Sequence, residues 1–238
     1  MKKAIVIGAS SGIGRELARL LSADDYRIAI VARRINLLNE FQSELPSKTL
    51  VKQLDVANTN DSIRVMSELI VEMDGVDLIV FAAGVGELNA NLEWELERMC
   101  IATNVAGFMA VANIAINHFI KRQSGHFVAI SSIAAIRGGK AAPAYNASKA
   151  FIANYLEGLR QKVVSLGFPI VITEIRPGYV DTAMAKGEGL FWVASVDKAS
   201  RQIYDAIRKK KSCVYVTKRW RLIALLLKWM PGVLYSRL

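Results

Sequence analysis

The chain has 238 residues, of which 53% are hydrophobic and 22% are charged. This apolar fraction excludes a disordered chain, and a single domain of this length buries a core without help from a disulfide or a metal. The two cysteines, Cys100 and Cys213, and the two histidines, His118 and His126, show neither disulfide-framework nor zinc-ligand spacing, so we expect no metal site.

Apolar runs alternate with segments of helical period along the whole chain. Strands are predicted at 4–7, 27–31, 49–54, 78–81, 126–130, 170–174 and 213–217, and helices at 13–22, 34–45, 59–73, 89–121, 143–166 and 196–210. Several strands are apolar on both faces, which is typical of a parallel sheet buried between two helix layers. We therefore predict an α/β fold, a doubly wound sheet of seven parallel strands, whose ligands bind at the carboxyl ends of the strands.

The net charge of +10 lies at one end of the chain. Residues 1–197 hold 20 Lys and Arg and 20 Asp and Glu, whereas residues 198–238 hold 11 Lys and Arg and one acid, Asp205. The prediction is one domain over 1–217 followed by a basic, apolar extension over 218–238. The apolar run at 4–7 is too short for a signal peptide, and no apolar run reaches the length of a membrane span, so we expect a cytoplasmic protein.

A glycine-rich turn follows the first predicted strand and opens the first helix. Three glycines, Gly8, Gly12 and Gly14, allow a sharp turn and a close approach of a diphosphate to the helix N-terminus. The intervening Ser10, Ser11 and Ile13 would line that site. The spacing G-x-x-x-G-x-G differs from the generic dinucleotide fingerprint, and a tight turn without a ligand has the same residues. Its position between strand and helix favours the cofactor interpretation.

The second predicted strand ends in Arg33 and Arg34, where an enzyme that uses NAD usually has an acid for the ribose 2′-hydroxyl. Guanidinium groups match a 2′-phosphate, so the sequence favours NADP(H) over NAD. The alternative is that both arginines are a solvated helix start. After the third strand, Asp55 and the backbone of Val56 are candidates to meet the adenine, although Asp55 would equally serve as a helix cap.

Three polar side chains are predicted to meet at the carboxyl edge of the sheet. Tyr145 and Lys149 are four residues apart near the start of a helix and share one face, and Ser132 follows the fifth strand. Reduction of a carbonyl needs a proton donor at the oxygen. A free tyrosine has a pKa near 10, and a nearby ammonium and a cationic nicotinamide would lower it. Ser132 would hydrogen-bond the substrate oxygen, where charge develops.

In this order and spacing, these motifs resemble the short-chain dehydrogenase/reductase family from about residue 3 to residue 217. Beyond the residues already named, the match rests on Ala82-Ala83-Gly84, Asn104, and Pro177-Gly178. The resemblance implies that Tyr145 is the acid/base, that Lys149 holds the nicotinamide ribose, that Ser132 stabilises the oxygen, and that Asn104 supports a proton-relay water. It also implies that Ala82, Ala83 and Gly84 contact the cofactor. The nicotinamide is then flanked by the backbone of Pro177, Gly178 and Val180, and its carboxamide is bound by Thr182.

The same resemblance suggests a variable substrate lid at 183–194, whose candidate contacts are Met184, Leu190, Phe191 and Trp192. Its aromatic residues favour an apolar substrate. Members of the family often form dimers or tetramers through the helices that correspond to 89–121 and 143–166. The usual threonine before the first glycine is Ile7 here, and the usual Asn-Asn-Ala-Gly is Phe81-Ala82-Ala83-Gly84, which removes two amide side chains.

The basic extension contains a short apolar helix pattern over 218–230. Arg221 and Lys228 share one edge of this helix, while Trp220, Ile223, Leu227 and Met230 lie opposite. Three explanations stay open: packing on protein, an anionic membrane surface, or another acidic partner. Nucleic acid is disfavoured because no base-reading motif is present.

The leading hypothesis is an NADPH-dependent oxidoreductase acting on an apolar ketone or aldehyde, or on the corresponding secondary alcohol. The second is a reductase of 3-oxoacyl thioesters on an acidic carrier protein. The third, from a different class, is an NADP-binding regulator that docks at a membrane without turnover. It is disfavoured because a regulator has no need of Asn104, Ser132, Tyr145 and Lys149 together.

Overall fold

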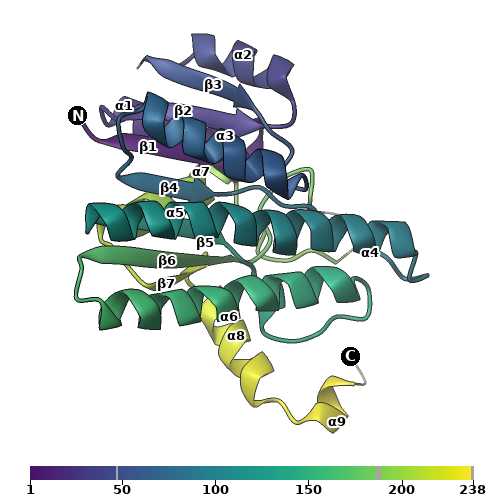
Figure 1. Cartoon of the computed structure of the whole chain (residues 1–238). Helices are drawn as coiled ribbons and strands as arrows, with labels where there is room; N and C mark the ends of the chain where they lie inside the picture. Colours follow the sequence, from purple (N-terminus) through teal and green to yellow (C-terminus); the bar gives the residue numbers. More distant parts are fainter. Residues whose placement is uncertain (47, 186–188, 237–238) are drawn as a thin grey trace.

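The computed structural model describes residues 1–46, 48–185 and 189–236. Its centre is one parallel sheet of seven strands in the order β3-β2-β1-β4-β5-β6-β7 (Figure 1). The strands are β1 (Lys3–Ile7), β2 (Arg27–Ala32), β3 (Thr49–Gln53), β4 (Leu78–Phe81), β5 (Gly125–Ile130), β6 (Ile170–Pro177) and β7 (Cys213–Val216). The predicted doubly wound α/β fold is confirmed, and the strand order reverses between β1 and β4, which is where such sheets bind ligands.

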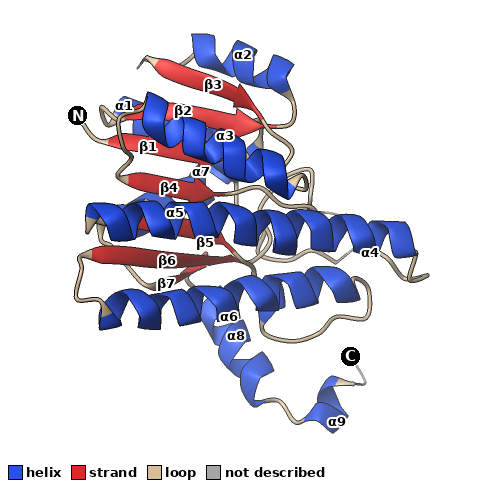
Figure 2. Cartoon of the chain, in the orientation of Figure 1, coloured by secondary structure: helices blue, strands red, loops and turns tan. Residues whose placement is uncertain are grey.

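Helices cover both faces of the sheet, as Figure 2 shows. The helices are α1 (Gly12–Ala23), α2 (Ile35–Ser43), α3 (Thr59–Glu72), α4 (Trp94–Ile101), α5 (Phe108–Arg122), α6 (Pro143–Ser165), α7 (Val196–Arg208), α8 (Trp220–Trp229) and α9 (Gly232–Tyr235). One core lies between the sheet and α3, α5 and α6, and the other between the sheet and α1, α2 and α7. Alternate residues of β1 divide between them: Ile5 and Ile7 face the first, and Ala4 and Val6 the second.

The helix predicted at 89–121 is where the structure departs most from the sequence pattern. It begins at Trp94, five residues later than predicted, and a π-helical turn over Ala102–Gly107 separates α4 from α5. The continuous helical stretch Trp94–Arg122 is long and apolar enough to cross a membrane by length and composition, but half of its most apolar window is buried inside the fold. We therefore read it as a core helix.

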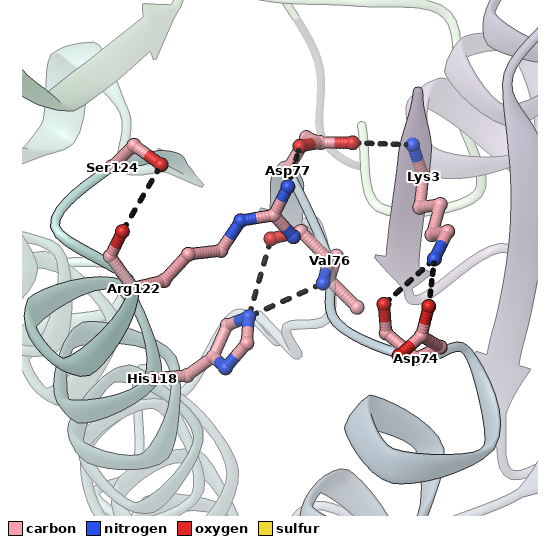
Figure 3. Close-up of polar contacts among 7 residues, drawn as sticks. All are labelled: Lys3, Asp74, Val76, Asp77, His118, Arg122 and Ser124. Carbon is pink, nitrogen blue, oxygen red and sulfur yellow. Dashed lines mark hydrogen bonds and ion pairs between the residues drawn. The ribbon is translucent and has the colours of Figure 1, made fainter. Parts of the chain in front are cut away.

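A polar cluster closes the amino-terminal edge of the sheet, at the opposite end from the predicted site (Figure 3). The Asp77 carboxylate accepts a hydrogen bond from the Lys3 amide at 2.8 Å and pairs with Arg122 at 2.7 Å. His118 lies 3.2 Å from both backbone groups of Val76. This histidine is thus bound to the backbone that leads into β4, which is a structural position.

The two last helices extend beyond the layers described above. The chain leaves β7, and α8 projects away from the body of the molecule before Pro231 turns it into α9 (Figure 1). The predicted C-terminal helix is α8, whereas α9 has no counterpart among the predicted elements.

Candidate active site

The glycine turn forms the expected cradle at the carboxyl end of β1. Gly8 and Gly12 have φ angles of +91° and +56°, in the left-handed region that favours glycine. Ser11 stands at the N-cap of α1 in extended conformation, and no side chain among the described residues caps the helix. The first amide N–H groups of α1 are therefore available to an anion, and the turn fits the diphosphate of a dinucleotide. Ile13 and Gly14 belong to this first helical turn.

Arg34 reaches back from the end of β2 to the glycine turn. Its guanidinium donates hydrogen bonds to the Ser10 hydroxyl at 2.9 Å and to the Ser11 hydroxyl at 2.7 Å. Arg33 lies on the other side, 3.9 Å from the carboxylate of Asp55. The Arg34 guanidinium and two hydroxyl groups thus lie together at the glycine turn, and Arg33 lies beside Asp55. Guanidinium and hydroxyl groups are donors that match a phosphate.

A hollow of about 380 Å³ adjoins these arginines, lined by Arg33, Gln53, Leu54, Asp55, Asp61, Arg64 and Val65. Its position beside Asp55 is where the sequence places the adenine. Asp55 does not cap α3, because Asn58 stands at that N-cap and accepts from the Asp61 amide at 3.2 Å. Val56 is buried, and its carbonyl accepts a hydrogen bond from the Ser62 hydroxyl at 3.3 Å.

Tyr145 and Ser132 meet at the carboxyl end of β5. The helix α6 begins at Pro143, whose fixed φ suits a first helical position, so Tyr145 lies on the first turn. Ser132 follows β5 and is hydrogen-bonded to Tyr145. The neighbouring Ser131 turns away, because its hydroxyl donates to the buried Glu174 carboxylate at 2.8 Å. The structure therefore brings Ser132, and not Ser131, to the tyrosine.

Lys149 lies one helical turn after Tyr145 and is buried, with 4% of its surface exposed. Its ammonium donates to the Ile130 carbonyl at 3.2 Å and lies 5.5 Å from the centre of the Tyr145 ring. Burial lowers the pKa of Lys149 to about 8. Burial also raises the pKa of Tyr145, and the hydrogen bond with Ser132 opposes that rise. The sequence led us to expect a lowered pKa for Tyr145, but in the chain by itself this pKa is raised. That a bound cationic nicotinamide lowers it stays a prediction.

Asn104 lies in the π-helical turn between α4 and α5, and π-helical turns are frequent at functional sites. Its amide side chain holds the backbone of Val85 in both directions, accepting from the amide at 2.9 Å and donating to the carbonyl at 2.7 Å. A Cβ at Gly84 would lie 3.3 Å from the Asn104 oxygen and 3.4 Å from the Lys149 nitrogen. Gly84 therefore leaves room for the Asn104 oxygen and the Lys149 nitrogen beside its backbone.

Three residues that support this cluster were not predicted from the sequence. Gly86 packs on the Tyr145 ring, since a Cβ there would lie 2.7 Å from two ring carbons. Ser148 accepts from the Asn104 amide at 3.0 Å, and Cys100 lies 3.6 Å from the Ser148 hydroxyl. Ser148 of α6 reaches Asn104 because α4 and the π-helical turn that follows it pack against α6. No spacing along the chain carries that signal.

The segment after β6 supplies the other wall of the site. Pro177 ends β6, the Gly178 amide donates to the Val216 carbonyl at 2.6 Å, and Val180 forms a bridge with Ala194. Thr182 lies opposite the glycine turn, 3.3 Å from the position of a Cβ on Gly12. Ala82, which follows β4, packs beneath Gly14, and Ala83 lies against Gly8. Thr182, Ala82 and Ala83 thus lie against the glycine turn.

The predicted lid packs through its aromatic residues on the C-terminal helix α8. The rings of Phe191 and Trp192 lie 5.1 and 5.9 Å from the ring of Trp220, at the start of α8, and Tyr179 lies 5.4 Å from it. Met184 is exposed and Leu190 is partly exposed. Residues 186–188 of the lid lie outside the described residues.

Comparison with known proteins identifies this type of site. The family model described as short chain dehydrogenase matches residues 2–190. An uncharacterized oxidoreductase of Myxococcus xanthus is 36% identical over 188 residues, covering 77% of this chain and 74% of that protein. The 3-oxoacyl-[acyl-carrier-protein] reductase of Bos taurus is 30% identical over 187 residues, covering 78% of each.

Solved structures share the fold over nearly the whole chain. A short-chain dehydrogenase from Sphingobium yanoikuyae in complex with NADPH superposes with a TM-score of 0.82 at 19% identity, covering 98% of this chain and 97% of that one. A short chain dehydrogenase/reductase from Burkholderia phymatum in complex with NAD gives 0.85 at 16% identity, covering 94% and 92%. Fold and site define an oxidoreductase. The chain belongs to the short-chain dehydrogenase/reductase family, which confirms the resemblance seen in the sequence.

Proposed function

We propose that this oxidoreductase transfers hydride from NADPH to the carbonyl carbon of an apolar ketone or aldehyde, and runs the reverse oxidation when the alcohol is in excess. The observation that carries this proposal is the convergence of Ser132, Tyr145, Lys149 and Asn104 beside the glycine turn, at the edge of the sheet where strand order reverses. Convergent polar groups of this kind are typical of an active site.

The roles of the residues follow from their positions. When bound, NADPH supplies the hydride. Tyr145 gives its phenolic proton to the substrate oxygen as charge develops there, and Ser132 donates a second hydrogen bond to the same oxygen. The raised pKa of Tyr145 suits the acid role, because the side chain keeps its proton at neutral pH. Lys149 holds the nicotinamide ribose and, with Asn104 and ordered water, returns a proton to Tyr145.

The proposed preference for NADPH rests on Arg33 and Arg34. The Arg34 side chain lies on the glycine turn and the Arg33 side chain lies beside Asp55, and neither Asp nor Glu stands at these two positions to bind a ribose 2′-hydroxyl. Relatives by fold are divided: the Sphingobium structure contains NADPH and the Burkholderia structure contains NAD. The side chains of this chain, rather than its fold, therefore support the choice.

The apolar substrate class rests on the aromatic lid, where the rings of Tyr179, Phe191, Trp192 and Trp220 form one cluster. A second candidate is a 3-oxoacyl thioester, and the 30% identity to the bovine 3-oxoacyl reductase favours it. Its carrier protein would be acidic, which suits the exposed Lys218 and Arg221 near the lid.

We expect the active form to be a homodimer or homotetramer, and the exposed Met99, Ile101 and Met109 on α4 and α5 are available for that contact.

The test follows NADPH oxidation with a panel of ketones, aldehydes and free or carrier-linked 3-oxoacyl thioesters. Tyr145→Phe is the matched control, because it keeps the ring that packs on Gly86 and removes only the hydroxyl. We expect turnover with at least one apolar ketone, lost by several orders of magnitude in the variant while NADPH affinity is kept. Turnover that survives in Tyr145→Phe would contradict the acid role, and a carrier-linked substrate preferred over every free ketone would select the second candidate.

A further inference from the structure

The helix α8 is apolar on two opposite sides, and only one of them is covered. Trp220 and Ala224 are buried, and Trp220 packs so closely on Gly178 that a Cβ at that glycine would overlap the indole. The other side is exposed: it carries Leu222, Leu225, Leu226 and Trp229, and it continues onto α9 through Val233 and Leu234. These six residues form what we call the outer apolar face. A soluble helix normally exposes polar residues there.

Basic side chains border the outer apolar face. Lys218, Arg219, Arg221 and Lys228 are all exposed, and within the described part of the chain no carboxylate forms an ion pair with any of them. Arg219 lies over the ring of Trp192, at 4.9 Å from its centre. The excess positive charge of the chain is carried by residues 198–238, whereas residues 1–197 are neutral. The face therefore combines large apolar side chains, a tryptophan and a basic rim.

We propose that α8 and α9 dock on the surface of an anionic lipid membrane, with the outer apolar face in the interface and the basic rim on the lipid headgroups. This combination of residues is the signature of a helix that lies in the plane of a membrane interface. Both helices project beyond the sheet and its covering helices (Figure 1). Ten residues in α8 are too few to span the bilayer, so the contact is peripheral.

Charge favours lipid over the other occupants of such a face. A second copy of the chain, packed face to face, would bring two basic rims together and be opposed by repulsion. An acidic carrier protein would form ion pairs with the basic rim, but this pairing would not account for the six exposed apolar side chains. An anionic bilayer satisfies both features at once.

The docked surface would adjoin the mouth of the active site on both sides. On one side, Trp220 of α8 packs on the rings of the lid. On the other, the Tyr235 hydroxyl of α9 donates to the Gly138 carbonyl, and the Arg137 guanidinium lies 4.5 Å from the Tyr235 ring centre. Gly138 belongs to the loop that leads into α6 and Tyr145. An apolar substrate dissolved in the bilayer would thus meet the site directly.

Vesicle flotation with the full chain tests this proposal without reading turnover, so its result is independent of the proposed reductase activity. The probes are vesicles of phosphatidylcholine alone and of phosphatidylcholine mixed with phosphatidylglycerol. We expect the chain to float with the anionic vesicles only. The variant Leu226→Glu/Trp229→Glu changes two exposed side chains and should lower vesicle affinity by about a hundredfold or more. Lys228→Glu should lower it by about tenfold or more, and by less at high salt.

The matched control is Ile63→Glu/Val71→Glu, which adds the same two charges at two exposed apolar residues of α3, on a different part of the molecule from α8 (Figure 1). It should float like the parent. Failure of the parent to float overturns the proposal. If the parent is then a larger oligomer than the double variant in analytical ultracentrifugation, the face is a contact between copies. Equal flotation with neutral vesicles, or unchanged flotation of the double variant, would also overturn the proposal.

Discussion

Replacing Lys149 by methionine should make the folded chain more stable at neutral pH while abolishing turnover. The Lys149 ammonium is buried, and burial lowers its pKa from 10.5 to about 8. Because one pKa unit corresponds to about 1.4 kcal/mol, keeping this group charged in the folded state costs about 3 kcal/mol. Methionine has a similar length and no charge. The substitution also leaves the Ile130 carbonyl without its hydrogen-bond donor, which costs about 1–3 kcal/mol and offsets part of the stability gained by removing the buried charge.

The dependence on pH is the sharper test. Between pH 8 and 10.5 the unfolded chain still holds the Lys149 proton and the folded chain has released it, so the free energy of unfolding of the parent rises with pH in that window. The parent should therefore gain about 3 kcal/mol relative to Lys149→Met between these two pH values, and nothing further outside them.

Urea unfolding followed by tryptophan fluorescence, at intervals from pH 7 to 10.5, gives the difference between parent and variant. Taking the difference cancels the other groups that titrate in this range, Tyr145 among them, provided that the substitution leaves their surroundings unchanged. If the free energies of unfolding of the two proteins run parallel across the whole pH range, the depressed pKa of Lys149 is refuted. The inference that burying this charge beside the tyrosine lowers the stability of the fold is then refuted as well.

Three further predictions test separate parts of the structure. Arg34→Ala should weaken NADPH binding by about tenfold to a hundredfold in a fluorescence titration and leave NADH nearly unchanged, since it removes charge-assisted hydrogen bonds to the 2′-phosphate; equal losses for both would contradict the assignment. His126 is buried neutral with its pKa lowered to about 4, so unfolding free energy should fall by about 3 kcal/mol as the pH drops from 6.5 to 4. His126→Gln should lose less over that interval in urea titrations, and an identical loss would count against the buried neutral histidine. Gly178→Ala should destabilise the parent by about 1–3 kcal/mol and cost clearly less in a Trp220→Ala background, because its new methyl group overlaps the indole. Additive effects in that double-mutant cycle would show that the two residues are not in contact.

The sheet and the order of its elements were predictable because each strand is buried on both faces and each connection is a helix. The strand at Leu78–Phe81 agrees with its prediction at both ends, since Asp77 before it and the small residues after it mark sharp changes of composition. The π-helical turn at Ala102–Gly107 was not predictable, because its residues have the same helical period as their neighbours. What interrupts the regular helix there is the attachment of Asn104 to the Val85 backbone, a contact between segments 19 residues apart.

Within the site, the polar residues could be named from sequence, but the environment that tunes them could not. Tyr145 and Lys149 share a face by helical spacing, yet the direction of their pKa shifts depends on burial by segments that are distant in sequence. The expectation of a lowered tyrosine pKa considered only the neighbouring charge. In the folded chain, desolvation dominates for both groups, because α6 brings them beneath the backbone that follows β4.

From the sequence, a protein contact, a membrane contact and another acidic partner all stayed open for α8, and the structure shows that Trp220 and Ala224 pack on the body while other apolar side chains of the helix are exposed. Periodicity assigns Trp220, Ile223, Leu227 and Met230 to one side, but it does not say which side faces the body. The contact with Gly178 determines which side faces the body, because this residue has no side chain and the Trp220 indole packs directly on its backbone. Once Trp220 is seated, helical geometry turns Leu222, Leu226 and Trp229 outward. The same contact that completes the lid therefore creates the exposed apolar face.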